Sequence, residues 1–474
     1  MNTVQRIIKN FGVLLSSQVI AYLLAFFYTI YIARYLGPNG FGIFSFSMAL
    51  ISIFGIFGDL GLSTLLTREV SRDKSLQNKY IGNLIPIKFI LSILTYSLLV
   101  LYVNLMDYPQ QTINVVYIFG FYMVILNFSM MFFALFQAYE KMEYQAISLL
   151  INNSLILIGV IYGISHGFNI VYFALIYLIA SLIILIYTLL ISIWKFASPH
   201  IKIDVKFWKI SIALALPLTI AFIFNSIAYY VDTILLESLK GSIIVGWYNA
   251  AYKLLTFSEF IPMVFTGAIF PVLSKFHVSS QDSLKFMYEK SLKFLFIIGL
   301  PIAAAATILA PDIILLLYKN SYYESIFALQ ILVWTIPFTY LAYMLNVLLV
   351  SINKQSILVK TTLVIMIFNV VTNLIFIPIY SYKAASIITV ITEIIGTTLL
   401  FYYVSRFIKI DIKNTFRSTF LKPIFASIIM SLFILFIHAN FYVSILVSIF
   451  VYLGLLLILK TFSKEDFDIL KKIV

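Results

Sequence analysis

Seven charged side chains lie within long apolar runs, and they are the residues of this chain best placed to bind a charged ligand. They are Arg34, Asp59, Lys88, Asp232, Lys253, Glu259 and Glu393. A charge at membrane depth costs about 2.5–3.5 kcal/mol on insertion scales, so it is a functional hypothesis by default. Carboxylates in such runs suit a proton or a sodium ion, whereas the cations suit an anionic substrate.

Two of the acids have structural alternatives. Asp59 lies within FGDLG, towards the inner end of an apolar run, and either binds a coupling ion or proton or pairs with Arg68 or Lys88. Lys88 itself lies about two turns into the next run, from which a lysine can snorkel to the surface. Asp232 lies within NSIAYYVDTILLES near the outer end of its run. It is either a second coupling residue or a helix-end carboxylate.

Three charges in the second half of the chain lie deeper in their runs. Lys253 is about ten residues beyond a Gly-containing turn, which makes snorkelling a poor explanation for it. Glu259 follows six residues later, and Glu393 lies mid-run within TVITEIIGTT without a charged neighbour in sequence. We predict that Glu259 and Glu393 belong with Asp59 and Asp232 among the coupling-ion or proton sites.

Substrate binding is predicted for two cations and two amides. Arg34 ends the first apolar run, where it is either a topological anchor or a cavity cation, and its guanidinium suits bidentate contacts with phosphate. Lys253 is the second phosphate candidate. Gln18 and Asn225 lie on the first and seventh runs, where amides facing lipid would be costly, so they are expected to face a wet cavity.

The elements that position these residues are membrane-spanning helices. Hydrophobic residues make up 62% of the chain and charged residues 11%, which excludes a soluble domain of this length. A span needs about 20 apolar residues, and runs of that length recur throughout. We predict an all-α polytopic membrane protein with about 14 spans, near 11–34, 41–66, 82–106, 113–138, 144–165, 170–195, 209–236, 243–270, 289–310, 323–350, 357–378, 382–405, 420–438 and 441–460.

Charge placement orients the spans. With both termini in the cytoplasm, about 26 of the 32 basic residues fall in inner loops, as the positive-inside rule requires. The formal net charge of +13 then faces anionic lipid of the inner leaflet, and a nucleic-acid partner is not expected. The expected location is the cytoplasmic membrane.

The chain also repeats itself. The stretch Leu36-Gly37…Gly42-Ile43-Phe44 resembles Leu239…Gly241…Gly246-Trp247-Tyr248, and LFQAYEKM at 135–142 resembles LLVSINKQ at 348–355. We predict an N-lobe of six helices at 1–200, a C-lobe of six at 201–410, and two additional helices with a cytoplasmic tail at 411–474. Repeats of this kind place a transport site at their interface, with alternating access. Arg34 and Lys253 are then expected to face each other across that cavity.

Several kinds of chemistry have no support in the sequence. Cysteine is absent, the four histidines are scattered, and no Walker-type phosphate loop is present. We therefore expect no metal site, no cofactor, no ATP hydrolysis and no enzymatic activity.

Four motifs in order resemble the polysaccharide exporters and lipid-linked oligosaccharide flippases of the multidrug/oligosaccharidyl-lipid/polysaccharide superfamily. They are RYLGPNGFGIFSFSMAL with FGDLGL and TREVSR, VDTILL…VGWYNAAYKL at 231–254, AIFPVLSKF at 268–276, and APDIILLLYKNSYYESIFALQIL at 310–332. The resemblance implies a carrier that moves a polyprenyl-phosphate-linked glycan to the outer leaflet, through a cationic cavity between two six-helix lobes. It also implies glycosyltransferase or polymerase partners.

Arg34 carries a second part of this resemblance. In Ala33-Arg34-Tyr35-Leu36-Gly37 it matches an arginine that lipid II flippases have in an ARxxG context at the outer end of their first span. Their acidic residue shortly after it has no counterpart, since Pro38-Asn39-Gly40 stands here instead. Two terminal spans also occur in lipid II flippases, where they line a lipid-tail groove.

Three other functions are compatible with a polytopic protein. A cation-coupled multidrug or small-molecule antiporter of the same superfamily is the first, although the cationic balance favours an anionic substrate. A membrane glycan polymerase is the second, and the longest outer segment here, about a dozen residues, is short for one. A structural scaffold is the third, and Lys253 and Glu393 within the spans argue against it.

Overall fold

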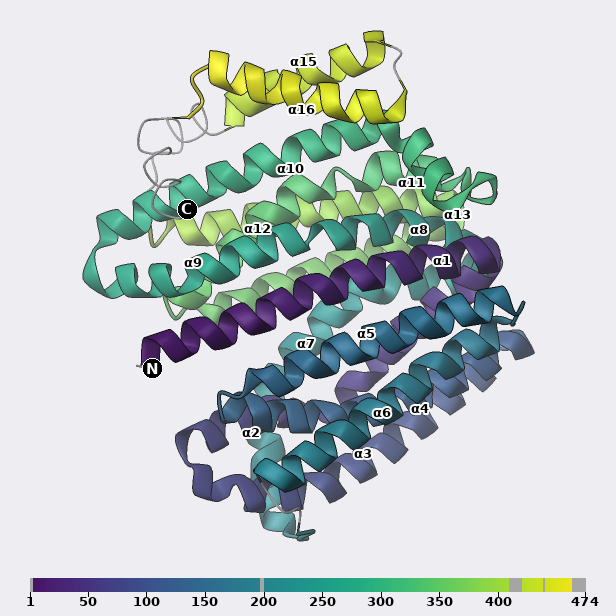
Figure 1. Cartoon of the computed structure of the whole chain (residues 1–474), viewed down its shortest axis with the longest axis vertical. Helices are drawn as coiled ribbons and strands as arrows, with labels where there is room; N and C mark the ends of the chain where they lie inside the picture. Colours follow the sequence, from purple (N-terminus) through teal and green to yellow (C-terminus); the bar gives the residue numbers. More distant parts are fainter. Residues whose placement is uncertain (1–2, 197–199, 409–419, 438–439, 463–474) are drawn as a thin grey trace. The chain divides into compact units, whose positions relative to one another are not determined.

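The chain folds into α-helices connected by short turns, as the computed structural model shows for residues 3–196, 200–408, 420–437 and 440–462 (Figure 1). Every regular element in these ranges is a helix, which confirms the predicted all-α class. Ten of the helices there are long and apolar enough to cross a membrane, or eleven with a bent pair counted as one span. The predicted tail beyond residue 462 lies outside the described residues.

Helix boundaries follow the predicted apolar runs closely. Two long helices contain a non-helical residue, Gly37 in one and Ser381 in the other, and each such residue falls between two predicted runs. The apolar helix Lys422–Phe436 is shorter than the ten helices counted as possible membrane spans, but it corresponds to the thirteenth predicted run. Runs two, eight and ten each contain a break, and a proline, Pro262 or Pro337, lies just after the break in runs eight and ten.

The structure divides into two compact units, Met1–Gly246 (unit 1) and Trp247–Val474 (unit 2). Unit 1 contains α1 (Thr3–Asp59), α2 (Leu62–Arg72), η1 (Lys74–Leu76), α3 (Gln77–Leu105), α4 (Gln110–Ala138), α5 (Met142–Ser165), α6 (Ile170–Lys195) and α7 (Val205–Lys240). Helix α1 is central, because it packs on α5, α4, α7 and α3, while α4 also packs on α6.

Unit 2 is built around α10. It contains most of α8 (Ser242–Ser258), then α9 (Phe260–Ser279), α10 (Gln281–Tyr318), η2 (Asn320–Tyr322), α11 (Ser325–Leu332), α12 (Thr335–Ser351), α13 (Gln355–Ser405), α15 (Lys422–Ile437) and α16 (Phe441–Ile458). Helix α10 packs on α12, α15, α11 and α9, and α12 packs on α13. The two terminal helices pack on each other and on α10.

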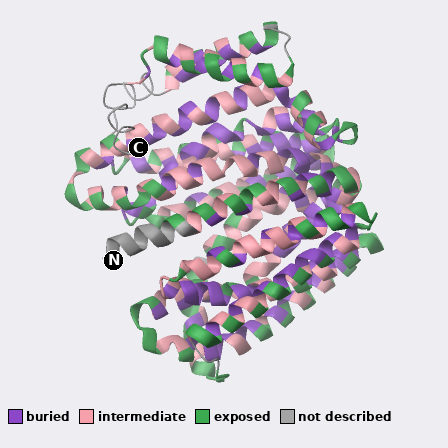
Figure 2. Cartoon of the chain, in the orientation of Figure 1, coloured by how far each residue is buried: buried purple, intermediate pink, exposed green. Residues whose placement is uncertain are grey.

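Large apolar side chains lie on the outer surface as well as in the buried core. Exposed residues occur along helices throughout the structure (Figure 2). On α6 the exposed positions carry large apolar side chains, whereas the buried face includes small and hydroxylated residues. The exposed set is Leu175, Ile179, Leu182, Ile186 and Leu190; the buried set includes Ala174, Ala180, Ser181, Thr188 and Ser192. Small residues let helices approach closely in lipid, and lipid solvates the outer stripe. This pattern identifies a multi-pass membrane protein.

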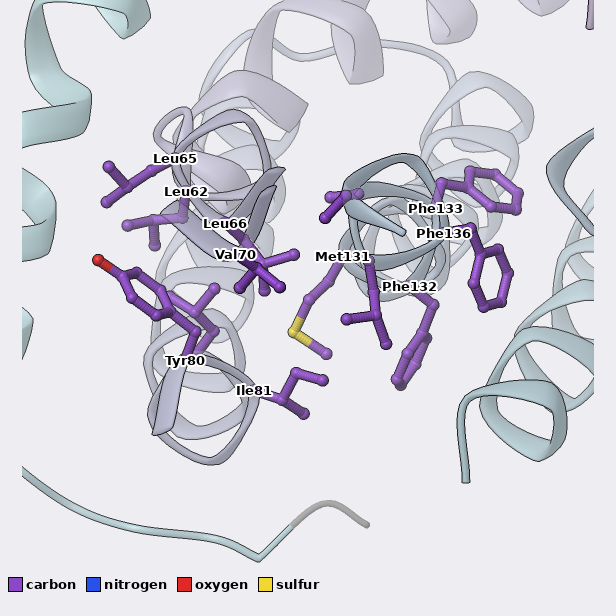
Figure 3. Close-up of a cluster of buried hydrophobic side chains, with 14 of the residues drawn as sticks. Leu62, Leu65, Leu66, Val70, Tyr80, Ile81, Met131, Phe132, Phe133 and Phe136 are labelled. Atoms are coloured by element: carbon purple, nitrogen blue, oxygen red, sulfur yellow. The ribbon is translucent and has the colours of Figure 1, made fainter. Parts of the chain in front are cut away.

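A buried cluster anchors the short helix α2 (Figure 3). Leu62, Leu65, Leu66 and Val70 recur with helical spacing on one face of α2, and this face packs against residues of α3 and α4. The partners include Tyr80, Ile81, Met131, Phe132, Phe133 and Phe136. Since α2 starts immediately after a break at residues 60–61, this packing fixes the geometry of the break.

Backbone conformation supports the internal repeat. Among the described residues, eight of the eleven with positive φ form pairs separated by 204 to 214 positions: Gly37 and Gly241, Asp107 and Lys319, Glu140 and Asn353, Gly167 and Ser381. Gly37 (φ 67°, ψ 179°) and Gly241 (φ 87°, ψ 170°) even share one conformation. Each pair lies at the same stage of the helix order, so the turns of the two halves are built alike.

Two repeat-related turns in unit 1 meet at backbone distance. A Cβ atom added to Gly42 would lie 1.7 Å from the Ser242 carbonyl oxygen, and one added to Gly246 would lie 2.0 Å from the Pro38 carbonyl oxygen. Pro38 corresponds to Ser242 and Gly42 to Gly246 in the repeat, so the two contacts are equivalents of each other. Glycine is required at both positions because any side chain would displace the opposite backbone.

We predict that Gly42→Ala and Gly246→Ala each destabilise the protein by about 1–3 kcal/mol, the usual cost of overpacking. The midpoint of thermal unfolding of the purified protein in detergent measures this. Gly454→Ala is the matched control, because no atom lies within 4 Å of a Cβ at that helical position. A Gly42→Ala protein that unfolds at the wild-type temperature would show that the turns do not pack as described.

Candidate functional site

Five of the seven intramembrane charges form two clusters, one in each unit, and each cluster lies at a helix break. In unit 1, α1 ends at Asp59, Leu60 and Gly61 have positive φ (47° and 70°), and α2 begins at Leu62. Such a break leaves backbone groups without intrahelical partners. The Asp59 carboxylate accepts hydrogen bonds from the backbone N–H (3.4 Å) and the hydroxyl (2.6 Å) of Ser63, in the first turn of α2.

Lys88 completes this group, which we call the Asp59 cluster (Asp59, Ser63, Lys88 and Asn127). Its ammonium forms a salt bridge with Asp59 and donates to the Ser63 hydroxyl (2.9 Å) and the Asn127 carbonyl oxygen (2.8 Å). An ammonium has three protons, so its donors are all used. The Lys88 side chain is 0% exposed, which shows that it does not snorkel to the surface.

Of the two pairing partners considered for Asp59, the structure selects Lys88. Arg68 instead donates to Glu69 at 2.8 Å. Gly58 permits the arrangement, because a Cβ there would lie 2.2 Å from the Asn127 side-chain nitrogen, which donates to the Gly55 carbonyl oxygen. The Asp59 cluster is therefore neutral overall, with one acid and one base.

A cavity of about 380 Å³ adjoins the Asp59 cluster within unit 1. Asp59, Ser63 and Asn127 contribute polar groups to its wall, Tyr122 lies on α4, and Phe222 belongs to α7. The remaining wall is mostly apolar. This cavity can admit a ligand next to a carboxylate whose charge is already balanced.

Helix α7 brings two further acids into unit 1. Asp232 is 2% exposed and accepts from the backbone N–H of Thr233 at 3.1 Å. Since α7 continues to Lys240, Asp232 lies two turns inside the helix and is not a terminal carboxylate. Glu237 is 5% exposed and accepts from the Ser242 hydroxyl at 2.5 Å. Glu237 was missed in the sequence, because it lies just beyond the predicted end of the seventh run at residue 236.

The other predicted residues of unit 1 lie apart from this cluster. Arg34 is exposed on α1, one turn before the interruption at Gly37, and it makes no hydrogen bond or ion pair within the described ranges. Gln18 is half-buried on α1, and Asn225 is exposed on α7. All three side chains thus remain available to a ligand.

The second cluster lies at the break between α8 and α9 in unit 2. Helix α8 ends at Ser258 and α9 begins at Phe260, with Pro262 in its first turn, where a missing N–H costs little. Tyr340 donates to the Ser258 carbonyl oxygen at 2.9 Å, and Tyr343 donates to the Glu259 carboxylate at 3.0 Å. Two tyrosines of α12 therefore satisfy the acceptors that the break exposes.

Glu393 and Lys253 join Glu259 there. Glu393, on α13, accepts from the Thr339 hydroxyl of α12 at 3.3 Å. Glu259 is close enough for its charge to act on both Lys253 and Glu393. We call this group the Glu259 cluster: Lys253, Glu259, Thr339, Tyr343 and Glu393. It brings together three residues singled out in the sequence and holds two carboxylates against one ammonium.

The two clusters therefore differ in charge. The Asp59 cluster is balanced by an ammonium with three hydrogen bonds, whereas the Glu259 cluster has one carboxylate more than it has cations. An uncompensated carboxylate at membrane depth requires a proton or a bound cation. Within the described part of the chain, no group of three or more His, Cys, Asp or Glu side chains is suited to hold a metal ion.

Comparison with known proteins places the chain among membrane transporters. Residues 7–277 match the family described as "Polysaccharide biosynthesis protein", and residues 217–378 match the MatE family. No curated protein sequence matches the chain.

Solved structures share its fold. A structure titled "Lipid II flippase MurJ, inward closed conformation" has a TM-score of 0.77 and 18% identity, with 93% of this chain and 96% of that chain covered. An inward-facing multidrug resistance MATE family transporter of the MOP superfamily has a TM-score of 0.65 and 16% identity, with 83% and 96% covered. A mutant of the Vibrio cholerae MATE transporter VcmN has a TM-score of 0.59 and 14% identity, with 85% and 97% covered.

We predict that Lys88→Met destabilises the protein by about 3–5 kcal/mol, because it leaves a buried carboxylate without its partner. Asp59→Asn combined with Lys88→Met removes both charges and should recover much of that loss. Thermal unfolding of the wild type, of Asp59→Asn, of Lys88→Met and of the double variant gives a double-mutant cycle. Additive losses across the cycle would show that the two side chains do not interact.

Proposed function

The chain belongs to the polysaccharide biosynthesis protein family, and we propose that it is a flippase for a polyprenyl-(di)phosphate-linked oligosaccharide. It would translocate this lipid-linked glycan across the cytoplasmic membrane by alternating access, for cell-surface polysaccharide biosynthesis. Both termini would lie in the cytoplasm, as the distribution of basic residues predicts. On this proposal the protein is a carrier and not an enzyme, and glycosyltransferases or a polymerase are its expected partners.

The extent of the fold likeness is the observation that carries this proposal. The structure titled lipid II flippase covers 93% of this chain, whereas the two MATE transporters cover 83% and 85%. The MATE transporters thus leave about a sixth of this chain uncovered. This share is comparable in size to residues 411–474, which contain α15 and α16. Helix content beyond two sets of six spans therefore favours a carrier of lipid-linked substrates.

Phosphate binding is assigned to Arg34 and Lys253. Arg34 is exposed and unpaired within the described residues, and its guanidinium can bind a phosphate through two hydrogen bonds. Lys253 lies half-buried beside Glu259, and no hydrogen bond within the described ranges engages its ammonium. Gln18 and Asn225 would contact the sugar hydroxyls, for which amides are suitable donors and acceptors.

Coupling to a proton or a sodium ion is assigned to the Glu259 cluster. Lys88 already neutralises Asp59, so the role of Asp59 is structural on this proposal. Lys253 acts on Glu259, and Glu259 acts on Glu393, so a substrate phosphate on Lys253 would leave the two acids to a proton or a cation. Asp232, buried on α7, is a further coupling candidate.

A cation-coupled small-molecule antiporter is the second candidate function. The match of residues 217–378 to the MatE family and the shared fold of the multidrug transporters favour it. An organic cation would be attracted to the surplus carboxylate of the Glu259 cluster, but it would be repelled by Lys253. Accumulation assays with organic cations distinguish this function from glycan export.

Deletion of the gene should cause lipid-linked glycan to accumulate on the inner side of the membrane, and the wild-type chain should reverse this. We predict that Lys253→Ala reduces export about tenfold or more, as expected when a charge-assisted phosphate contact is lost. Lys209→Ala is the control, since Lys209 is exposed at the start of α7. Wild-type export by Lys253→Ala would exclude the phosphate-binding role.

We predict that Glu259→Gln and Glu393→Gln each weaken the dependence of transport on the driving ion. A coupling free energy of about 1–3 kcal/mol corresponds to a 5–150-fold change in affinity. Transport into proteoliposomes under imposed proton or sodium gradients measures this. The double variant Asp59→Asn/Lys88→Met should keep its gradient dependence, so loss of coupling in that variant alone would move the coupling site to unit 1.

A further inference from the structure

The two repeats differ at one turn, and the difference creates a pocket in unit 2. In unit 1 four aromatic side chains fill the equivalent space, where the end of α6 meets the turn between α4 and α5. The Phe196 ring lies 5.5 Å from Phe136, 4.9 Å from Tyr139 and 5.9 Å from Tyr144, centroid to centroid. Lys74 contacts the Ala138 carbonyl oxygen and lies 4.4 Å from the centre of the Tyr139 ring.

The equivalents in unit 2 follow from the repeat. Glu140 and Asn353, both with positive φ, align the turn between α4 and α5 with the turn between α12 and α13. The same alignment replaces the three aromatic partners by aliphatic residues, because Phe136, Tyr139 and Tyr144 correspond to Leu349, Ile352 and Ile357. Phe407 follows Arg406 at the end of α13 as Phe196 follows Lys195 at the end of α6. Among the described residues, Phe407 therefore lacks the three aromatic partners that Phe196 has in unit 1.

A cavity of about 500 Å³ occupies this place. Its wall comes from three segments of unit 2: the turn between α9 and α10, the turn after α12, and the end of α13. The lining residues include His277, Asp282, Lys285, Ile352, Lys354 and Phe407. On the predicted topology the cavity opens to the cytoplasmic side, at the level of the lipid head groups.

Two basic groups of the cavity have no ion-pair partner among the described residues. Lys354 corresponds to Lys141 of unit 1, whose ammonium lies 3.6 Å from Glu143. Ser356 stands where the repeat has Glu143, so that this ion pair is lost in unit 2. Lys354 and Lys285 form no ion pair with any residue that the structure describes, and Lys354 lies 5.2 Å from the centre of the Phe407 ring.

His277 adds a further observation. Its Nδ1 atom is buried and has no hydrogen-bond partner in the described part of the protein, although His277 lines the cavity. A buried polar atom without a partner is costly unless a ligand or water satisfies it. The first turn of α10, which starts at Gln281, lies at the same place, and the dipole of the helix favours an anion there. Among the described residues of the cavity wall, Asp282 is the one acid.

We propose that this pocket is a binding site for a phosphate group, held by Lys285, Lys354 and His277. The phosphate would belong either to an anionic phospholipid of the inner leaflet or to a soluble phosphorylated metabolite. The volume exceeds the need of inorganic phosphate and accommodates a head group. A bound phosphate would connect the α9–α10 turn to the α12–α13 turn, a role that Lys74 and the aromatic stack perform in unit 1.

Binding to the purified full-length chain tests the proposal without any transport assay, so its failure leaves the proposed function untouched. The probes are glycerol 3-phosphate for the soluble source and phosphatidylglycerol in mixed micelles for the lipid source, with phosphatidylcholine as the neutral lipid. We expect wild-type protein to bind one of the two anionic probes, seen as a rise in unfolding temperature and as retained lipid in native mass spectrometry. Binding of only one probe identifies the source.

Two variants separate charge from space. Lys285→Gln/Lys354→Gln should weaken probe binding about tenfold or more, since two charge-assisted hydrogen bonds are lost. Ile352→Tyr restores the aromatic residue of unit 1 and should block binding with no change of charge. The control Lys141→Gln/Lys209→Gln removes the same charge elsewhere and should bind as wild type does. Equal binding by the wild type and both pocket variants, or binding by none of them, overturns the proposal.

Discussion

The need to satisfy every polar group without water governs this structure. Lipid offers no hydrogen bonds, so each interruption of a spanning helix needs partners from within the protein. At the break after α1 the Asp59 carboxylate and Ser63 provide them, and Lys88 balances the charge. At the break after α8, Tyr340 donates to the Ser258 carbonyl oxygen and Tyr343 donates to the Glu259 carboxylate. Both breaks are therefore held by side chains from helices distant in sequence.

The same constraint explains why the two clusters have different chemical capacities. The Lys88 ammonium, whose three protons are all hydrogen-bonded, holds Asp59 in place. If a mobile ion replaced the ammonium beside Asp59, the buried lysine would have no partner. The Glu259 cluster has hydroxyl donors in place of a second cation. Hydroxyl groups stabilise a carboxylate in either protonation state, because they donate and accept. A site that must load and release an ion needs this tolerance.

Sequence reasoning located the spans well, because hydropathy over about 20 residues reports directly on the bilayer. The turns of the repeat were also readable, since Gly37 and Gly241 are needed for positive φ. The partners within each cluster were not readable. Glu259 and Glu393 meet only through the packing of α8, α12 and α13, and Asp59 pairs with Lys88 although Arg68 is much nearer in sequence. Glu237 was missed because its burial depends on the tertiary fold.

A duplicated fold has two copies of each structural feature. One copy can stabilise the fold while the other changes. Unit 1 has a neutral charge cluster and an aromatic seal of Phe136, Tyr139, Tyr144 and Phe196 at its inner turn. In unit 2 both features are open: a carboxylate is in surplus, and aliphatic residues replace the seal. Stability requires paired charges and filled space. On our proposals, ligands complete the interactions at both of these places in unit 2.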